Sequence, residues 1–111
     1  MNDTEVLRFT ATGDPSGLSI AGEIDEDSYP VLVRTLEEFA ADRPEIHLYL
    51  AAVRYCDLAG LRAIVRLTEV RSDGHCRRVV LHELPPQLRT VLEIVGWDST
   101  PGLVVDQPTV T

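Results

Sequence analysis

Residues 55–61 read Tyr-Cys-Asp-Leu-Ala-Gly-Leu and separate two segments of different periodicity. The preceding residues 46–53 are apolar except for His47 and Tyr49, which is typical of a strand covered on at least one face. The following residues 59–72 carry apolar side chains at the spacing of one helix face. The heptapeptide therefore marks the turn from a buried strand into an amphipathic helix, and loops of this kind often carry function.

The rest of the chain alternates strands and helices in the same way. We expect strands at residues 6–12, 18–21, 46–53, 77–82 and 103–105, the first two forming a hairpin through the turn residues 13–17. We expect helices at residues 28–41, 59–72 and 85–96. Strands joined through helices are parallel with right-handed crossovers. The order predicts an α/β domain with a mixed sheet of four to five strands and three or more helices mainly on one face.

Residues 1–111 are expected to form one domain, with a core at about 6–105 and a loosely ordered tail at 106–111. Asp27 or Ser28 can cap the first helix, and Pro30 suits its first turn. The expected buried stripes of the three helices are Leu32, Leu36, Phe39 and Ala40; Leu61, Ile64, Val65 and Thr68; and Leu88, Val91, Leu92 and Val95.

The charge of the chain limits its partners. Its 18 acidic and 10 basic residues give a net charge of −8, which disfavours nucleic acid and anionic membranes as partners. All the basic residues are arginines, so the chain has no lysine for a Walker motif, a Schiff base or a receiver domain. No apolar run approaches the roughly 20 residues that cross a bilayer, and no charged segment precedes an apolar one at the start. We expect no membrane insertion.

Cys56 and Cys76 have neither metal-ligand nor redox-pair spacing, which indicates free thiols in a reducing compartment, the cytoplasm. They are expected at opposite ends of the sheet, too far apart for a disulfide. Asp57 should raise the pKa of the Cys56 thiol and so disfavour a reactive thiolate. His47, His75 and His82 are scattered over the predicted elements, so we expect structural or exposed histidines and not ligands.

Two stretches, Gly22-Glu23-Ile24-Asp25 and Asp57-Leu58-Ala59-Gly60-Leu61, occur in this order within the predicted element pattern. They resemble Gly-Glu-Leu-Asp and Asp-Ser-Ser/Thr-Gly-Leu of STAS domains, the sulfate transporter and anti-sigma factor antagonist family. The resemblance covers about Val6 to Val105. It implies the STAS fold and a bacterial regulator of transcription. Soluble single-domain members antagonise anti-sigma factors, and bind a protein that is both a serine kinase and a sigma-factor inhibitor.

In that family the serine after the loop aspartate is phosphorylated, and the phosphate ends the contact with the kinase. Here Leu58 occupies the serine position and Ala59 follows it, so the resemblance implies no phosphoacceptor in this loop. Tyr49 is a second departure, because many members have Asp or Asn at the end of this strand. The hypothesis is a domain that binds its partner constitutively, regulated by expression, competition or another protein.

By the resemblance, the partner-binding residues are expected in the loop after the second strand and in the Asp57 turn: Glu23, Asp25, Asp27, Asp57, Leu58, Ala59, Gly60 and Leu61. We expect no enzyme activity, no catalytic residue, no metal, no cofactor, and a monomer or weak homodimer. Asp57 can also be a structural helix cap, and Gly60 a residue required by local packing. The acidic cluster can be a solvated or docking face; a divalent-metal site, or aspartyl phosphorylation in the manner of a response-regulator receiver, is the less favoured reading.

Two other functions stay open at this point. A STAS accessory or scaffold subunit of a transporter or signalling assembly would need no phosphoserine. A sensor of a nucleotide or other small molecule near Asp25 is the weaker alternative, because the sequence has no glycine-rich phosphate loop.

Overall fold

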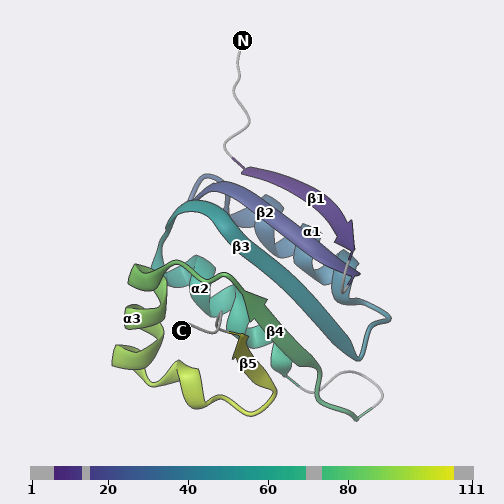
Figure 1. Ribbon diagram of the computed structural model, residues 1–111. Helices are drawn as coiled ribbons and strands as arrows, with labels where there is room; N and C mark the ends of the chain where they lie inside the picture. The colour runs from purple at the N-terminus through teal and green to yellow at the C-terminus, as the bar shows by residue number, and fades with distance from the viewer. Residues whose placement is uncertain (1–6, 14–15, 70–73, 107–111) are drawn as a thin grey trace.

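A computed structural model describes residues 7–13, 16–69 and 74–106, and contains a single mixed sheet (Figure 1). Its strands run in the spatial order β1-β2-β3-β4-β5. The first strand is antiparallel to its neighbour and the other pairs are parallel. The strands are β1 (Leu7–Gly13), β2 (Ser16–Ile24), β3 (Glu45–Cys56), β4 (Arg78–His82) and β5 (Leu103–Asp106).

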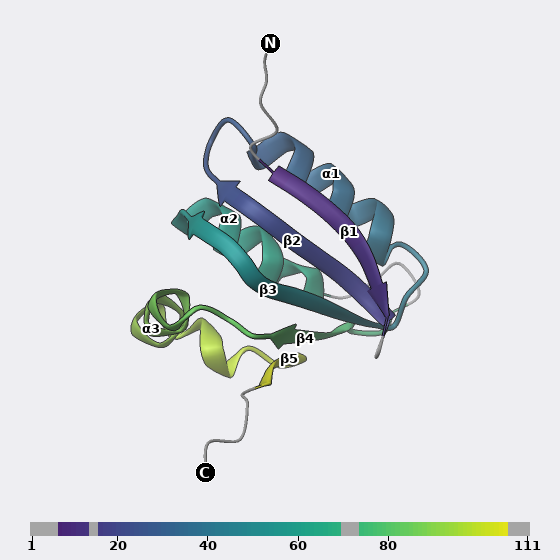
Figure 2. The same cartoon turned by 45° about the horizontal axis from the view of Figure 1, so that its top comes forward.

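Three helices connect the parallel strands. They are α1 (Tyr29–Ala40), α2 (Leu58–Val65) and α3 (Pro86–Val95), with 3₁₀ turns η1 (Arg66–Thr68) and η2 (Trp97–Ser99). Figure 2 shows α1 and α2 side by side under one face of the sheet, and α3 at the side of β4. The predicted α/β class, with a mixed sheet and three helices mainly on one face, is confirmed. None of the helices in the described part of the chain is long and apolar enough to span a membrane.

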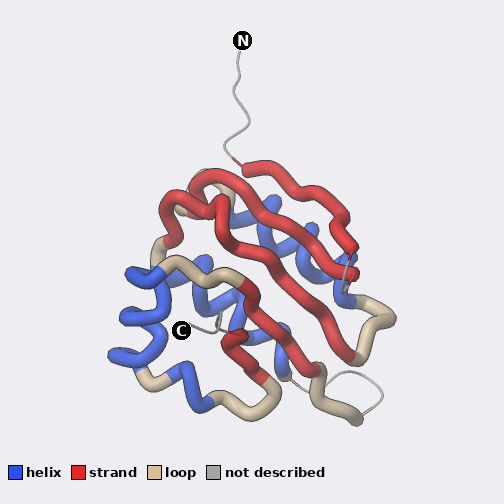
Figure 3. Tube along the Cα trace, viewed as in Figure 1, coloured by secondary structure: helices blue, strands red, loops and turns tan. Residues whose placement is uncertain are grey.

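The core lies between the sheet and the helices. Ile20, Leu48 and Leu81 point to it from the three middle strands, and each is fully buried. Leu32 and Leu36 of α1 close it from the other side. In the strands that alternate in this way, the intervening residues face the opposite side of the sheet, which we call the open face. Figure 3 shows that the described helices leave this open face uncovered.

Two strands run three residues past their predicted ends. β2 continues to Ile24 and β3 to Cys56, since Glu23 pairs with Tyr55 and Ile24 with Cys56 in the parallel ladder. The sequence did not predict this extension because it lacks a continuous apolar pattern: Glu23 is partly exposed, and Arg54 and Tyr55 on β3 are exposed. Tyr49 lies well inside β3, whereas the family comparison concerned a residue at the end of this strand.

The tail prediction also needs correction at Asp106. This residue belongs to β5 and pairs with His82, so it is part of the sheet. Residues 107–111 of the predicted tail, and residues 1–6 before β1, lie outside the described residues.

The second helix is shorter than expected. α2 ends at Val65 and continues as the η1 turn, where the buried Thr68 hydroxyl donates to the Val65 carbonyl at 2.8 Å. A side-chain bond to the preceding turn competes with regular helix geometry. Residues 70–73, at the predicted end of this helix, lie outside the described residues. On α3, Leu88 and Leu92 are buried as predicted, whereas Val95 is 38 % exposed because the helix ends at Gly96, which has a left-handed φ of 80°.

Candidate functional site

The loop between β3 and α2 is organised by Asp57. Its Oδ1 accepts a hydrogen bond from the Gly60 N–H at 2.8 Å, and its carbonyl accepts from the Leu61 N–H at 3.1 Å. Asp57 has an extended backbone, as an N-cap residue requires. The predicted cap is confirmed, and it fixes the first turn of α2.

Replacing Asp57 by alanine is expected to lower the free energy of unfolding by about 1 kcal/mol, because the Gly60 N–H loses its acceptor. Asp57→Asn is the matched control, since the amide oxygen can still accept and asparagine caps about as well as aspartate. Urea unfolding measures both. Equal losses in the two variants would show that the hydrogen bond does not hold this turn.

The loop between β2 and α1 is organised by Asp25 and Ser28. The Asp25 Oδ1 accepts from the N–H groups of Asp27 and Ser28, both at 3.1 Å. The buried Ser28 hydroxyl donates to the Glu23 carbonyl at 2.9 Å and accepts from the Asp25 N–H at 3.0 Å. Ser28 occupies the N-cap position of α1, as the sequence allowed, but its side chain does not cap the helix. It stabilises the preceding loop instead.

The two loops are joined directly. The Asp57 N–H donates to the Ile24 carbonyl at 2.9 Å, which continues the β2–β3 ladder to the start of α2. Gly60 packs against Ile24 so closely that a Cβ there would overlap the Ile24 Cγ2 methyl. Of the two explanations for this glycine, close packing on the neighbouring segment accounts for it.

The predicted binding residues differ in what they offer a partner. Leu58 is 52 % exposed at the start of α2, Ala59 beside it is exposed, and Tyr55 at the end of β3 is 54 % exposed. Gly60 is buried, and the Leu61 side chain is 1 % exposed within the core. These last two shape the loop from inside, because their side-chain positions are not accessible to a partner.

The surface beside this apolar group is acidic. Glu26 and Asp27 are exposed, and Glu23 and Asp25 are partly exposed. The one basic group paired with them in the described structure is Arg54, at 3.6 Å from Glu23, and both side chains are largely in water. Such a pair is worth little. Within the described residues, no group of three or more His, Cys, Asp or Glu side chains has the arrangement of a metal site. The structure thus places exposed apolar and acidic side chains together at this end of the sheet.

A shallow pocket of about 170 Å³ lies between the end of β3 and α3. Tyr55 and Cys56 line it from the strand, and Leu88 and Val91 from the helix. It extends the apolar surface of the loop toward α3. Sequence reasoning missed it because α3 is distant from Tyr55 along the chain.

Both cysteines are free thiols, in agreement with the sequence prediction. Burial, together with the negative charge of the adjacent Asp57 carboxylate, raises the pKa of the Cys56 thiol to about 12. Its Sγ also lies 3.4 Å from the Asp57 carbonyl, to which it can donate. A thiol with this pKa is almost wholly protonated in neutral solution, so it is a packing group and not a nucleophile.

A thiol reagent at about pH 8 is therefore expected to modify the folded protein at the exposed Cys76 and to leave Cys56 intact, because the thiolate is the reactive form. Both thiols should react in denaturant. Peptide mapping after brief alkylation measures this. Cys76→Ser gives the matched control, which should take up no label while folded. Fast labelling of Cys56 in that variant would contradict the assignment.

Two of the three histidines differ from the prediction in their placement, although their hydrogen bonds fit the expected structural role. His47 and His82 are not scattered: their ring centroids lie 5.1 Å apart, on adjacent strands of the open face. Their nitrogens also contact one another at 2.8 Å. The sequence gives no signal for this contact, since it depends on the register between β3 and β4.

Comparison with known proteins places this geometry in a family. The family model described as "Mlab, STAS domain" matches residues 7–106. Among solved structures, an anti-sigma factor antagonist from Mycobacterium paratuberculosis is similar, with a TM-score of 0.70 and 25 % sequence identity over 94 % of this chain and 87 % of that chain. Comparison with curated proteins gave no match. Because the family model spans nearly the whole sequence, the chain belongs to the STAS domain family.

Proposed function

We propose that this domain is an antagonist of an anti-sigma factor and binds a serine kinase-type anti-sigma protein. Its role is that of a binding module and not of an enzyme. The contact surface comprises the β2–α1 loop and the start of α2. The observation that carries the proposal is the exposure of Leu58 on a loop that is already fixed by the Asp57 cap.

The apolar and acidic parts of this surface have different tasks in the proposal. Leu58 and Tyr55 supply apolar area that a partner can cover, and buried anchors of this kind dominate binding energies. Glu26 and Asp27 supply negative charge that attracts a basic partner and sets its orientation. The likeness to an antagonist of an anti-sigma factor supports this choice of partner.

Phosphate cannot end this contact in the way that the family resemblance implies. A phosphoserine would add about −1.5 to −2 charges at the start of α2. Neither Leu58 nor Ala59 has an oxygen that could accept a phosphoryl group. The proposed complex is therefore constitutive with respect to this loop.

Affinity capture from the native cell, with the wild-type domain as bait, tests the proposed partner. Recovery of a kinase-type anti-sigma protein, and direct binding of that protein in purified form, supports the proposal. Recovery of a transporter ATPase or a signalling scaffold, with no binding to a purified kinase-type anti-sigma protein, contradicts it and favours an accessory subunit.

Leu58→Ser is expected to turn the domain into a substrate of such a kinase, because it restores a hydroxyl at an exposed position in the first turn of α2. Incubation with the kinase and ATP should add the mass of one phosphate group to the variant, mapped to residue 58. The wild-type chain is the control and should gain none in this loop. A variant that binds the kinase but stays unmodified would contradict the assigned register of the loop.

A further inference from the structure

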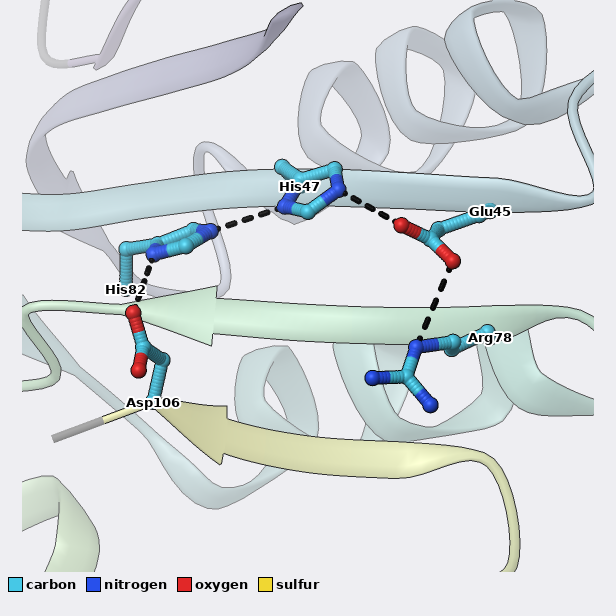
Figure 4. Close-up of polar contacts among 5 residues, drawn as sticks. All are labelled: Glu45, His47, Arg78, His82 and Asp106. Atoms are coloured by element: carbon cyan, nitrogen blue, oxygen red, sulfur yellow. Dashed lines mark hydrogen bonds and ion pairs between the residues drawn. The ribbon is translucent and has the colours of Figure 1, made fainter. Parts of the chain in front are cut away.

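Five polar side chains form a connected array on the open face of the sheet, on the side away from α1 and α2 (Figure 4). The His47 Nε2 lies 2.8 Å from the Glu45 Oε2, and the His82 Nδ1 lies 2.9 Å from the Asp106 Oδ2. The remaining nitrogens, His47 Nδ1 and His82 Nε2, lie 2.8 Å apart. The Arg78 Nε lies 3.3 Å from the Glu45 Oε1.

The number of protons in this array follows from its contacts. An ionised carboxylate only accepts hydrogen bonds, so Glu45 and Asp106 each require an N–H from their histidine. The bond between the rings requires one further N–H, on either His47 or His82. Three ring protons are needed, whereas two neutral imidazoles carry only two. Two imidazolium rings would carry four, and two N–H groups would then point at each other.

The charges of the neighbouring groups suit a singly protonated pair. Glu45 and Asp106 bring two negative charges, and Arg78 and the extra ring proton bring two positive charges. The histidine side chains are 14 % and 13 % exposed, so these charges act on rings that are largely shielded from water. Neutral rings would leave the pair of carboxylates balanced by Arg78 alone.

The surrounding strands hold the two rings in place. The Tyr49 ring stacks on His82 with centroids 4.5 Å apart, and these two residues are register partners on β3 and β4. Gly17 of β2 leaves room for this arrangement, since a Cβ there would overlap the His47 backbone and crowd the Tyr49 ring. On the other side, β5 brings Asp106 opposite His82.

We propose that His47 and His82 form a proton-binding site that holds one proton between the two rings. The separation of 2.8 Å is that of a hydrogen bond; two Zn–N bonds of about 2 Å each would set the nitrogens farther apart. The proton connects β3, β4 and β5 through side chains, in addition to the backbone ladder. Loss of this proton would leave one of the three hydrogen bonds without a donor N–H. None of the five residues belongs to the proposed partner-binding loops.

Nitrogen-15 NMR of the histidine-labelled wild-type domain, in EDTA, tests the proposal during titration from about pH 8 to about pH 5, the range in which histidine commonly changes charge. The expected result is a state in which His47 Nε2 and His82 Nδ1 carry fixed protons and the two inner nitrogens show intermediate shifts. A scalar coupling across the hydrogen bond should connect those inner nitrogens. Absence of the coupling throughout the titration would overturn the proposal.

Variants supply a second measurement. In His82→Gln, His47 has no second ring with which to share a proton. Its nitrogen resonances should then follow the titration of a single imidazole. His75→Gln is the matched control, because residue 75 precedes β4 and stands outside the five-residue array, and it should leave the His47 titration unchanged. An unchanged His47 titration in folded His82→Gln would contradict a shared proton. The coupling in the wild-type domain decides the question if the variant does not fold.

Discussion

Leu58→Asp is expected to weaken binding of the proposed anti-sigma partner by at least about 30-fold, which corresponds to about 2 kcal/mol, the usual threshold of an interface hot spot. The leucine is 52 % exposed at the start of α2, so a partner that covers it would have to bury a carboxylate instead. The fold itself should not suffer, because a negative charge is favourable in the first turn of a helix. Titration calorimetry with the purified partner measures the affinity.

The control for this substitution is Ile94→Asp. Ile94 lies on α3 and is 77 % exposed, so the change removes an exposed apolar side chain and adds a charge away from the proposed loop. Its affinity should stay within about 2-fold of the wild type, as expected for a residue outside the interface. Equal losses in both variants would indicate a general effect of charge and contradict a contact centred on Leu58.

Gly60→Val is expected to lower the free energy of unfolding by about 3 kcal/mol, at the upper end of the usual cost of overpacking. The new Cβ would overlap the Ile24 methyl and crowd the Cys56 Sγ and the Asp57 Oδ1, both 3.3 Å from its position. Valine fits a helix better than glycine, but that gain is only a few tenths of a kcal/mol and cannot offset the overlap. Urea unfolding gives the difference.

Ala59→Val is the matched control, because it puts the same side chain on the neighbouring, exposed position of the same helix turn. Its expected cost is about 0.5 kcal/mol, from helix propensity alone. Combining Gly60→Val with Ile24→Ala should destabilise less than the sum of the two single changes, since the alanine removes the methyl that clashes. Strict additivity would show that the two residues are not in contact.

The element order was predictable from the sequence because each helix has a clear apolar stripe and two helices have a start or stop residue in the expected place. Gly96 ends α3 and Pro30 lies in the first turn of α1, as expected. The strand ends were less predictable. An alternating apolar and polar pattern indicates a strand with one solvent-exposed face. Arg54 and Tyr55 do not alternate in this way, because both are exposed. Hydrogen bonding to β2 keeps them in the strand.

At the candidate site, the sequence predicted the Asp57 cap, because a cap follows from local chemistry. It did not predict the role of Ser28, whose hydroxyl bonds the loop behind it and not the helix in front. Capping residues have several local acceptors within reach, and packing decides among them.

The meeting of His47 and His82 was not predictable, since it depends on the register of two strands that are distant in the chain. The parallel pairing of Tyr49 with His82 places the rings together, and a shift of one residue would send one histidine to the helix-covered face. Asp106 was expected in a loose tail for a related reason. Its place is set by pairing with β4 and not by its own sequence context.

The hydrogen bond from the Asp57 N–H to the Ile24 carbonyl has a consequence for the thermodynamics of association. Together with the Asp25 and Asp57 side-chain bonds, it leaves little backbone freedom in either loop of the proposed contact surface before a partner binds. Ordering a free loop costs about 1–2 kcal/mol per residue of backbone entropy. This domain has met that cost on folding, so its association should be fast and lose little entropy within the loops.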